Sequence, residues 1–303
     1  MEFQGMGEPD CKEQSIKDAN QLLAHWTRHD WREVLTAPNL CVLQALTTGR
    51  ATASGAGDTR EDALECCLGE TAEIAAHAAL RAADLPPIAT GQTGMAAHSD
   101  AEMAQQLALF EAHERAAIWA WWFGQTSALP VAPEWLEGQG IDAWLSRVRQ
   151  GAALRRQTGV WLLDYPGSIT VAIGRAQSVG GQDPILGFGA DTDPERAIRK
   201  ALREMLLMEL NLGEVLAARS GHSDQDTSAI ENKIATYARR CPALLRDEGG
   251  IEPQASLSNP EAASIEGMTF RDVTPPGQLR RVWCCSLPDS SACGLEGQGS
   301  PFM

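Results

Sequence analysis

The stretch that decides the fold reads Glu61-Asp62-Ala63-Leu64-Glu65-Cys66-Cys67-Leu68-Gly69-Glu70, because its pattern occurs three times in the chain. The pattern is Glu-x-Ala, four residues, and then Leu-x-Glu. The three copies span residues 61–70, 102–111 and 195–204. The intervals between the copies are unequal, so the pattern is not a simple tandem repeat.

A glycine-containing run precedes each copy. The runs are Gly55-Ala56-Gly57, the segment from Gly94 to Asp100, and Gly187-Phe188-Gly189. We expect each run to be a turn, since glycine adopts backbone conformations closed to other residues. A Thr, Ser or Asp then caps a helix with an acidic residue in its first turn, and Pro194 stands where a first-turn proline is tolerated. Because Ala and Leu five apart, together with the further apolar residues between them, form one apolar stripe, each copy predicts an amphipathic helix.

The closing glutamate of each copy lies two turns into its helix. In the first two copies a second glutamate follows three residues later, which gives the pairs Glu70/Glu73 and Glu111/Glu114 beside the single Glu204. Residues three apart share a helix face, so the like charges repel. One interpretation is a set of solvated helix faces in an acidic protein. The other is a cluster of carboxylates around a divalent cation, since Mg²⁺ takes oxygen ligands and commonly bridges to nucleotide phosphates.

Composition narrows the classes of function. The chain has 303 residues, enough for one large or two small domains, and a formal net charge of −15. Such an acidic chain lacks the basic face of a nucleic-acid-binding protein. We find no leader pattern and no apolar run of membrane-spanning length, so we expect a cytoplasmic protein with no membrane partner.

The eight cysteines include two adjacent pairs and no C-x-x-C. This spacing fits neither a zinc site nor a small secreted disulfide framework, so we expect buried thiols in a reducing compartment. The six histidines are scattered, and His113-Glu114 lacks the second histidine of a zinc-protease helix. A transition-metal site made by the protein alone is therefore not expected.

Taken in order, the chain predicts three parts: an N-terminal helical extension over residues 1–39, a main domain over 40–288 and a flexible C-terminal tail over 289–303. Leu22, Trp26 and Val34 form the apolar side of the first helix, which Pro38 closes. Short strands alternate with long helices, which is typical of an α+β fold with helices packed on sheets. A Pro- and Gly-rich linker is expected over residues 129–140, followed by a helix from Ile141 to about Leu154. We expect the Trp119-Ala120-Trp121-Trp122 cluster to pack in the core rather than to stack on bases.

An ordered set of blocks resembles the YcaO-domain family. Leu68-Gly69-Glu70-Thr71-Ala72-Glu73 is similar to that family's S-A-L-G-E-x-x-E-R helix, and Glu111-Ala112-His113-Glu114-Arg115 with Trp121-Trp122 resembles its E-L-I-E-R-D…W-W block. Ala201-Leu202-Arg203-Glu204 is similar to its A-L-x-E-x-x-Q helix. Arg271-Asp272-Val273-Thr274-Pro275-Pro276 fits the closing segment. The resemblance runs from about Leu40 to Pro288 in the same order.

The resemblance implies a YcaO-like α+β fold with ATP and Mg²⁺ as cofactors. Carried over by position, five glutamates become Mg²⁺ ligands or nucleotide contacts: Glu70, Glu73, Glu111, Glu114 and Glu204. Arg115 and Arg199 become phosphate contacts. Several positions depart from the family pattern: Cys66 replaces a serine, Ile74 an arginine, Ala56 a lysine, Ala116 an aspartate and Leu207 a glutamine. The family's Pro-rich C-terminus is replaced by Gly299-Ser300-Pro301-Phe302-Met303.

Two functions of different class follow from the resemblance. The first is an ATP-dependent cyclodehydratase subunit that forms thiazoline or oxazoline rings from Cys, Ser or Thr of a ribosomal precursor peptide. Its implied partners are that peptide, a protein that binds the leader peptide and, as an optional member of the complex, a flavin-dependent azoline dehydrogenase. The second is a degenerate subunit that binds peptide or a sister subunit without catalysis. Thioamide or amidine formation through the same activated amide stays open as a third.

Overall fold

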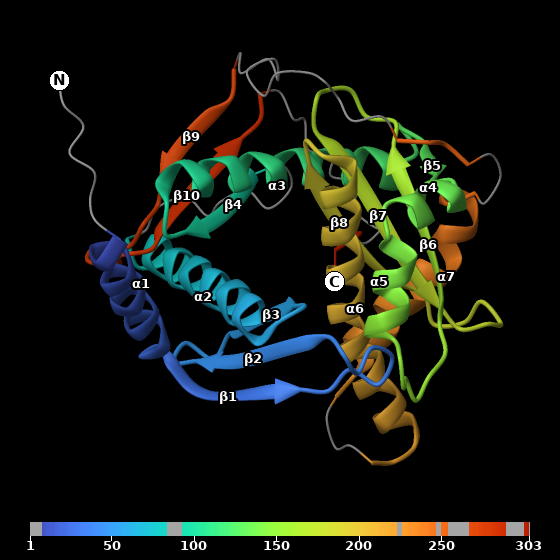
Figure 1. Cartoon of the computed structure of the whole chain (residues 1–303), viewed down its shortest axis with the longest axis horizontal. Helices are drawn as coiled ribbons and strands as arrows, with labels where there is room; N and C mark the ends of the chain where they lie inside the picture. The colour runs from blue at the N-terminus through green and yellow to red at the C-terminus, as the bar shows by residue number, and fades with distance from the viewer. Residues whose placement is uncertain are drawn as a thin grey trace.

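Three antiparallel sheets build the fold, and one long helix packs on each of them (Figure 1). The structure is a computed structural model that describes residues 8–83, 93–222, 226–246, 250–253, 267–288 and 300–302. The sheets are β1 (Trp26–Arg32), β2 (Cys41–Thr47), β3 (Thr52–Gly57); β4 (Thr93–His98), β10 (Arg281–Ser286), β9 (Thr269–Asp272); and β5 (Ala128–Pro130), β6 (Gln157–Leu163), β7 (Thr170–Gln177), β8 (Ile185–Asp191). The helices are α1 (Glu8–Leu23), α2 (Arg60–Ala82), α3 (Ala101–Trp122), α4 (Pro133–Gly138), α5 (Ile141–Val148), α6 (Pro194–Arg219) and α7 (Ser228–Leu244).

The three helices predicted from the repeated pattern are confirmed as α2, α3 and α6. Their N-cap side chains accept hydrogen bonds from the first turn, as expected, and they belong to Thr59, Asp100 and Asp193. In α2 the cap is a full capping box, because the Asp62 side chain also accepts from the Thr59 backbone. The small and branched residues of the pattern are buried against the sheets, apart from the half-buried Leu109. The expected α+β class with repeated helices on sheets is therefore confirmed.

The glycine runs are strands, and the expectation that they form turns is wrong. Gly55 and Gly57 lie in β3, Gly94 in β4, and Gly187 and Gly189 in β8. All five have ordinary negative φ or extended backbone, since none is among the positive-φ glycines. A Cβ at Gly94 would lie 2.0 Å from the Ala108 carbonyl oxygen, and one at Gly187 would lie 2.1 Å from the Met205 backbone nitrogen. The glycines therefore serve close approach of helix to strand.

The N-terminal helix ends at Leu23, earlier than expected, because residues Trp26–Arg32 form β1 and pair with β2. Aromatic and β-branched residues favour an extended backbone here. The Trp26 indole nitrogen donates to the Thr71 hydroxyl of α2 at 2.9 Å. The prediction of a helix up to Pro38 is therefore wrong, and a domain boundary at residue 39 stays a prediction.

Other departures concern the middle of the chain. The expected linker at residues 129–140 contains most of β5 and all of α4, and α5 ends at Val148 rather than near Leu154. The Trp cluster packs in the core as expected: Trp121 and Trp122 are fully buried beside Tyr237 of α7. Among the cysteines that the structure describes, four are buried thiols and none forms a disulfide. Within the same residues, no helix is both long and apolar enough to cross a membrane.

The end of the chain does not behave as a free tail. Residues 289–299 lie outside the described residues, but Ser300 and Pro301 are held by α7: the Lys233 Nζ donates to the Ser300 carbonyl and the Tyr237 hydroxyl to the Pro301 carbonyl, both at 2.6 Å. Pro301 is buried. The expectation of flexibility is therefore wrong for residues 300–302.

Candidate functional site

Two edge strands, β4 and β8, line one cavity, and a third, β3, binds Glu70 at its margin. β3, β4 and β8 each stand at the edge of their sheet, with the helix of the same repeat packed on them. An edge strand leaves backbone N–H groups without a ladder partner, and these need another acceptor when they are covered by protein. The closing glutamates of the three repeats supply that acceptor.

Each closing glutamate accepts a hydrogen bond from the strand residue sixteen positions earlier. The three pairs are Ser54 N to Glu70 at 2.5 Å, Met95 N to Glu111 at 2.8 Å and Phe188 N to Glu204 at 2.6 Å. Glu73 makes the same kind of contact across repeats, since its carboxylate accepts from Ala97 N of β4 at 3.0 Å. The strand edges thus fix the carboxylates, and one face of each carboxylate remains directed to the cavity.

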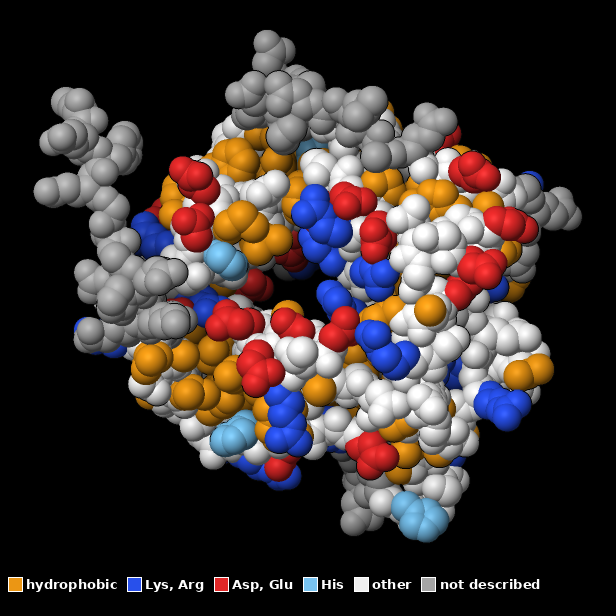
Figure 2. Space-filling view, in the orientation of Figure 1, with side chains coloured by type: hydrophobic (Ala, Val, Ile, Leu, Met, Phe, Trp, Pro, Cys, Tyr) orange, Lys and Arg blue, Asp and Glu red, His pale blue; other side chains and the backbone are white. Residues whose placement is uncertain are grey.

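The cavity has a volume of about 780 Å³, and we name it the carboxylate cavity. All five predicted glutamates line it: Glu70 and Glu73 from α2, Glu111 and Glu114 from α3, and Glu204 from α6. Figure 2 shows a hollow near the middle of the molecule with acidic and basic side chains around it. The sequence prediction that the three helices bring these glutamates to one place agrees with this geometry.

Burial and mutual repulsion act on these carboxyl groups. Burial, followed by the charges of Glu111 and Glu70, raises the pKa of Glu73 well above its ordinary value. Burial and the charges of Glu204 and Glu111 do the same to the pKa of Glu114. Burial raises the pKa of Glu204 to about 7. A divalent cation would relieve this repulsion, so the donor set fits a hard metal ion.

The side chains are not arranged as a finished coordination sphere. Among the described residues, no three His, Cys, Asp or Glu side chains lie close enough together to hold one metal ion. Glu111 is engaged by Arg115, whose Nε and Nη2 donate to one carboxylate oxygen at 2.8 and 2.5 Å. The assignment of the five glutamates as metal ligands therefore stays a prediction, and it requires carboxylates to change rotamer when a metal binds.

Cations stand on the same wall as the carboxylates. Arg115 lines the cavity as predicted. Arg199 does not line it, because this side chain pairs with Glu195 at 2.8 Å and its Nη2 donates to the Gln139 carbonyl. Residues five apart on a helix point about 140° away from each other, so Arg199 cannot share the face of Glu204. The prediction of Arg199 as a phosphate contact is not supported by this placement.

Three further residues that the sequence did not predict also line the cavity: Lys200, Arg280 and Phe302. Lys200 lies four residues before Glu204, on the same helix face, so helix periodicity could have found it. Arg280 is almost fully buried, and its Nε donates to Asp18 at 2.9 Å. The two residues are 262 positions apart in the sequence, so no local pattern predicts this contact. Phe302 carries no signal at all in the sequence.

Cys66, which stands where the resemblance expects a serine, is exposed to the carboxylate cavity. Desolvation raises the pKa of its thiol, so the group is neutral at pH 7. A neutral thiol is a poor metal ligand and a weak hydrogen-bond donor.

Ile74 does not line the carboxylate cavity. It lines a smaller chamber of about 200 Å³ that shares Glu70, Glu73 and Glu111 with the large cavity.

The comparisons with known proteins agree with this geometry. A family model described as YcaO cyclodehydratase, ATP- and Mg²⁺-binding, matches residues 79–281. No curated protein matched the chain. The YcaO protein of Methanopyrus kandleri, solved with AMPPCP and Mg²⁺, has a TM-score of 0.60 and 16% identity over 93% of this chain and 90% of that chain.

Two further solved structures are similar. A heterocyclase in complex with substrate and cofactor has a TM-score of 0.67 and 15% identity over 91% of this chain and 52% of that chain. A chain of the E. coli microcin synthetase McbBCD complex with pro-MccB17 bound has a TM-score of 0.61 and 13% identity, with 88% of each chain covered. At these identities the likeness shows a shared fold.

The fold and the cavity define a class: an α+β protein whose repeated strand–helix units turn glutamates and cations toward one cavity. Within that class, the chain belongs to the YcaO family, whose cofactors are ATP and Mg²⁺.

Proposed function

We propose that the chain is an ATP- and Mg²⁺-dependent cyclodehydratase subunit that forms thiazoline or oxazoline rings in a ribosomal precursor peptide. The observation that supports this most is the convergence of five glutamates from α2, α3 and α6 on one cation-lined cavity. A cavity of about 780 Å³ is large enough for a nucleotide and part of a peptide. The family described as cyclodehydratases gives the reaction class.

In the proposed reaction, the thiol or hydroxyl of a peptide Cys, Ser or Thr loses its proton and forms a bond to the carbonyl carbon of the preceding residue. The carbonyl oxygen must then leave, and it is a poor leaving group. ATP supplies a phosphoryl group that turns this oxygen into phosphate. Loss of that phosphate and of the amide proton completes the C=N bond of the ring. Catalysis then depends mainly on positioning and on neutralising charge.

Named side chains take the binding roles in this proposal. The glutamates of the carboxylate cavity would hold Mg²⁺ through carboxylate oxygens, and Glu111 would first have to release Arg115. Arg115 and Lys200, which line the same cavity, would face the phosphates. The Lys200 Nζ is already held by Asp191 Oδ2 at 2.8 Å and the Ala190 carbonyl at 3.0 Å, so its position needs little reorganisation.

The proposed partners are the precursor peptide, a protein that binds its leader, and a flavin-dependent dehydrogenase as an optional member. The similar chain of the microcin synthetase comes from a complex that has its pro-peptide bound. By analogy with that complex, we propose that a partner presents the peptide to the carboxylate cavity.

One observation favours the competing function, a subunit that binds without catalysis. Ile74 lies where the resemblance expects an arginine, beside Glu70, Glu73 and Glu111, and an isoleucine cannot neutralise a phosphate. Each lost charge-assisted contact costs roughly 1–3 kcal/mol of binding free energy. Lys200 lines the carboxylate cavity and offsets part of this loss, so catalysis remains the better-supported proposal. Thioamide or amidine formation would use the same activated amide.

Isothermal titration with AMPPCP tests the proposal, with and without Mg²⁺, on the wild type and on the double variant Glu70→Gln/Glu111→Gln. The proposal expects Mg²⁺-dependent binding that the double variant loses. A matched control is Glu134→Gln on α4, which lies away from the carboxylate cavity and is expected to bind like the wild type. If the wild type fails to bind millimolar nucleotide with its partner subunits present, the enzyme proposal falls and the binding subunit remains.

A further inference from the structure

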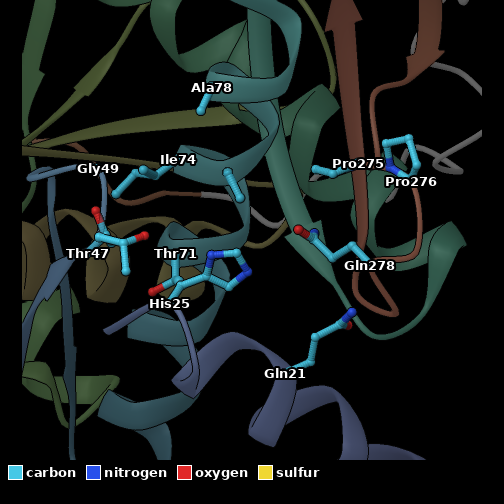
Figure 3. Close-up of a pocket in the computed structure, with 12 residues that line it drawn as sticks. Gln21, His25, Thr47, Gly49, Thr71, Ile74, Ala78, Pro275, Pro276 and Gln278 are labelled. Carbon is cyan, nitrogen blue, oxygen red and sulfur yellow. The ribbon is translucent and has the colours of Figure 1, made fainter. Parts of the chain in front are cut away.

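A second pocket lies beside α2 and shares no lining residue with the carboxylate cavity. It has a volume of about 300 Å³, and we name it the Ile74 pocket. Figure 3 shows Ile74 and Ala78 of α2 on one side of it, with Pro275 and Pro276 of the segment before β10 across from them. His25, at the corner between α1 and β1, closes the lower side.

Hydrogen bonds fix the walls of this pocket. The side-chain amide of Gln21 donates to the Gly277 carbonyl at 2.7 Å and accepts from the Leu279 backbone at 2.9 Å, which ties α1 to the segment before β10. The backbone of Thr48 donates to the His25 carbonyl at 2.8 Å and thereby ties the β2–β3 turn to the same corner. A pocket framed in this way is present before any ligand arrives, so binding needs little ordering of the chain.

The lining of the Ile74 pocket carries no Asp, Glu, Lys or Arg among the residues that the structure describes. Its apolar lining comes from Ile74, Ala75, Ala78 and the two prolines, and the rest of the lining is polar. Within the described part of the chain, the His25 ring and the Thr48 hydroxyl form no hydrogen bond, so both are free for a ligand. A lysine or arginine side chain finds no carboxylate here, whereas an apolar side chain with an adjoining peptide group finds both apolar contacts and hydrogen-bond partners.

The pocket is joined to the candidate site through one residue. Ile74 lines both this pocket and the smaller chamber that contains Glu73, Glu111 and Arg115. A group held against one side of Ile74 therefore lies one side chain away from the carboxylates. The replacement of an expected arginine by Ile74 also makes the wall between the two spaces apolar.

We propose that the Ile74 pocket binds the uncharged, apolar side chain of the residue that precedes the modified Cys, Ser or Thr in the substrate peptide. This rests on the proposed function, since that residue supplies the carbonyl that is attacked. The carbonyl carbon of this preceding residue must reach the glutamates. The Cα of the same residue is one bond away from that carbonyl carbon. Its side chain therefore enters the neighbouring space, and the pocket selects it by shape and by the absence of charge.

Two capped dipeptides test this proposal: N-acetyl-leucyl-cysteinamide and N-acetyl-lysyl-cysteinamide, titrated into the full chain and followed by ligand-observed NMR. We expect the leucyl probe to bind about tenfold more tightly, the effect of burying most of a leucine side chain. Ala78→Lys places a charge at the pocket, and we expect it to remove this preference. Ala82→Lys, one turn further on α2 and equally exposed, lies outside the pocket and is the matched control that keeps the preference.

Binding of AMPPCP and Mg²⁺ to the same variants separates this proposal from the proposed function. Ala78 does not line the carboxylate cavity, so nucleotide binding by Ala78→Lys is expected to equal that of the wild type. Nucleotide binding without any leucyl preference would overturn the pocket proposal alone. A leucyl preference that survives in Ala78→Lys, or no detectable binding of the leucyl probe at about 10 mM, would contradict it as well.

Discussion

At the scale of single residues, the direction of a side chain on its helix decides its role. Lys200 and Arg199 are neighbours in sequence, but only Lys200 lies on the face of α6 that lines the carboxylate cavity. Lys200 also sits over the Phe110 ring at 5.0 Å. Arg199 lies over Trp144 at 5.8 Å, outside the cavity. Lys200 and Arg199 therefore form a matched pair for mutation, one inside the cavity and one outside it.

We predict that Lys200→Met weakens Mg²⁺-dependent AMPPCP binding by roughly tenfold to a hundredfold, the usual effect of removing one charge-assisted contact to phosphate. Arg199→Met removes the same formal charge from the adjacent position and is expected to leave the affinity within about twofold. Isothermal titration measures both. Equal losses in the two variants would mean that only the overall charge of the protein matters.

The raised pKa values of the cavity glutamates predict a pH dependence of stability in the metal-free protein. Burial raises the pKa of Glu204 from 4.5 to about 7, so the folded state binds its proton more tightly than the unfolded state does. The contribution of Glu204 to the stability of the fold is fully present below the pKa that this group has in the unfolded state, and it is lost as the pH rises toward 7. Burial raises the pKa of Glu73 and Glu114 as well, with the same sign.

We therefore predict that the free energy of unfolding, measured with urea in the presence of a chelator, decreases between about pH 5 and pH 7.5. Mg²⁺ is expected to recover part of the loss at the higher pH, because it binds the folded state. In Glu204→Gln the side-chain amide carries no charge at any pH in this range, so we expect the unfolding free energy to change less steeply with pH. A stability that increases with pH over this window would contradict the crowding of the carboxylates.

At this scale the sequence predicted that the five glutamates and Arg115 belong to one site, and all six line the cavity, because helix spacing and a family pattern both act locally. Their roles as metal and phosphate contacts stay predictions. It did not predict Arg280, which is placed by an ion pair with Asp18 at the other end of the chain. Such pairs depend on how sheets are joined, and residue spacing does not contain that information.

At the scale of elements, the contact between a glycine-bearing edge strand and its helix is the repeated unit. A Cβ at Gly187 would meet the backbone of α6 at 2.1 Å, and backbone cannot yield as a flexible side chain would. The sequence analysis predicted turns at these glycines. Glycine is favoured both in turns and where two backbones come close together, so the residue type alone does not separate the two cases. Every residue of β8 is buried, as expected for a covered strand and not for an exposed turn, and this distinguishes the two.

We predict that Gly187→Ala destabilises the fold by roughly 1–3 kcal/mol or more, the cost of overpacking. It should also displace Glu204, whose carboxylate accepts from the next residue, Phe188. Gly138→Ala, where an added Cβ meets nothing within 4 Å, is the control and is expected to be neutral or slightly stabilising. Urea unfolding of the two variants measures the difference, and equal stabilities would contradict the close-approach account.

At the scale of the whole molecule, one cavity connects segments that are far apart in the chain, from Glu65 to Phe302. Phe302 packs against Phe188 at 5.4 Å between ring centroids, and the Arg115 guanidinium lies over its ring at 5.4 Å. Phe302 is thus part of the cavity wall, and it completes the surroundings of Arg115. No spacing in the sequence indicated this, because the contact is tertiary and spans most of the chain.

We predict that Phe302→Ala weakens Mg²⁺-dependent AMPPCP binding by roughly threefold to tenfold through the loss of a cation–π contact that orients Arg115. Phe270→Ala on β9 removes an equally large but exposed ring and is expected to leave the affinity unchanged. Isothermal titration compares the two. An affinity unchanged in Phe302→Ala would separate the end of the chain from the nucleotide site.

The measurement that tests the central claim most directly is a crystal structure of the protein grown with AMPPCP and Mn²⁺, with anomalous scattering used to locate the metal. We predict Mn²⁺ in the carboxylate cavity, with carboxylate oxygens from at least two of α2, α3 and α6 as ligands and the nucleotide phosphates beside Arg115 and Lys200. Anomalous density absent from this cavity while nucleotide is bound elsewhere would contradict the account.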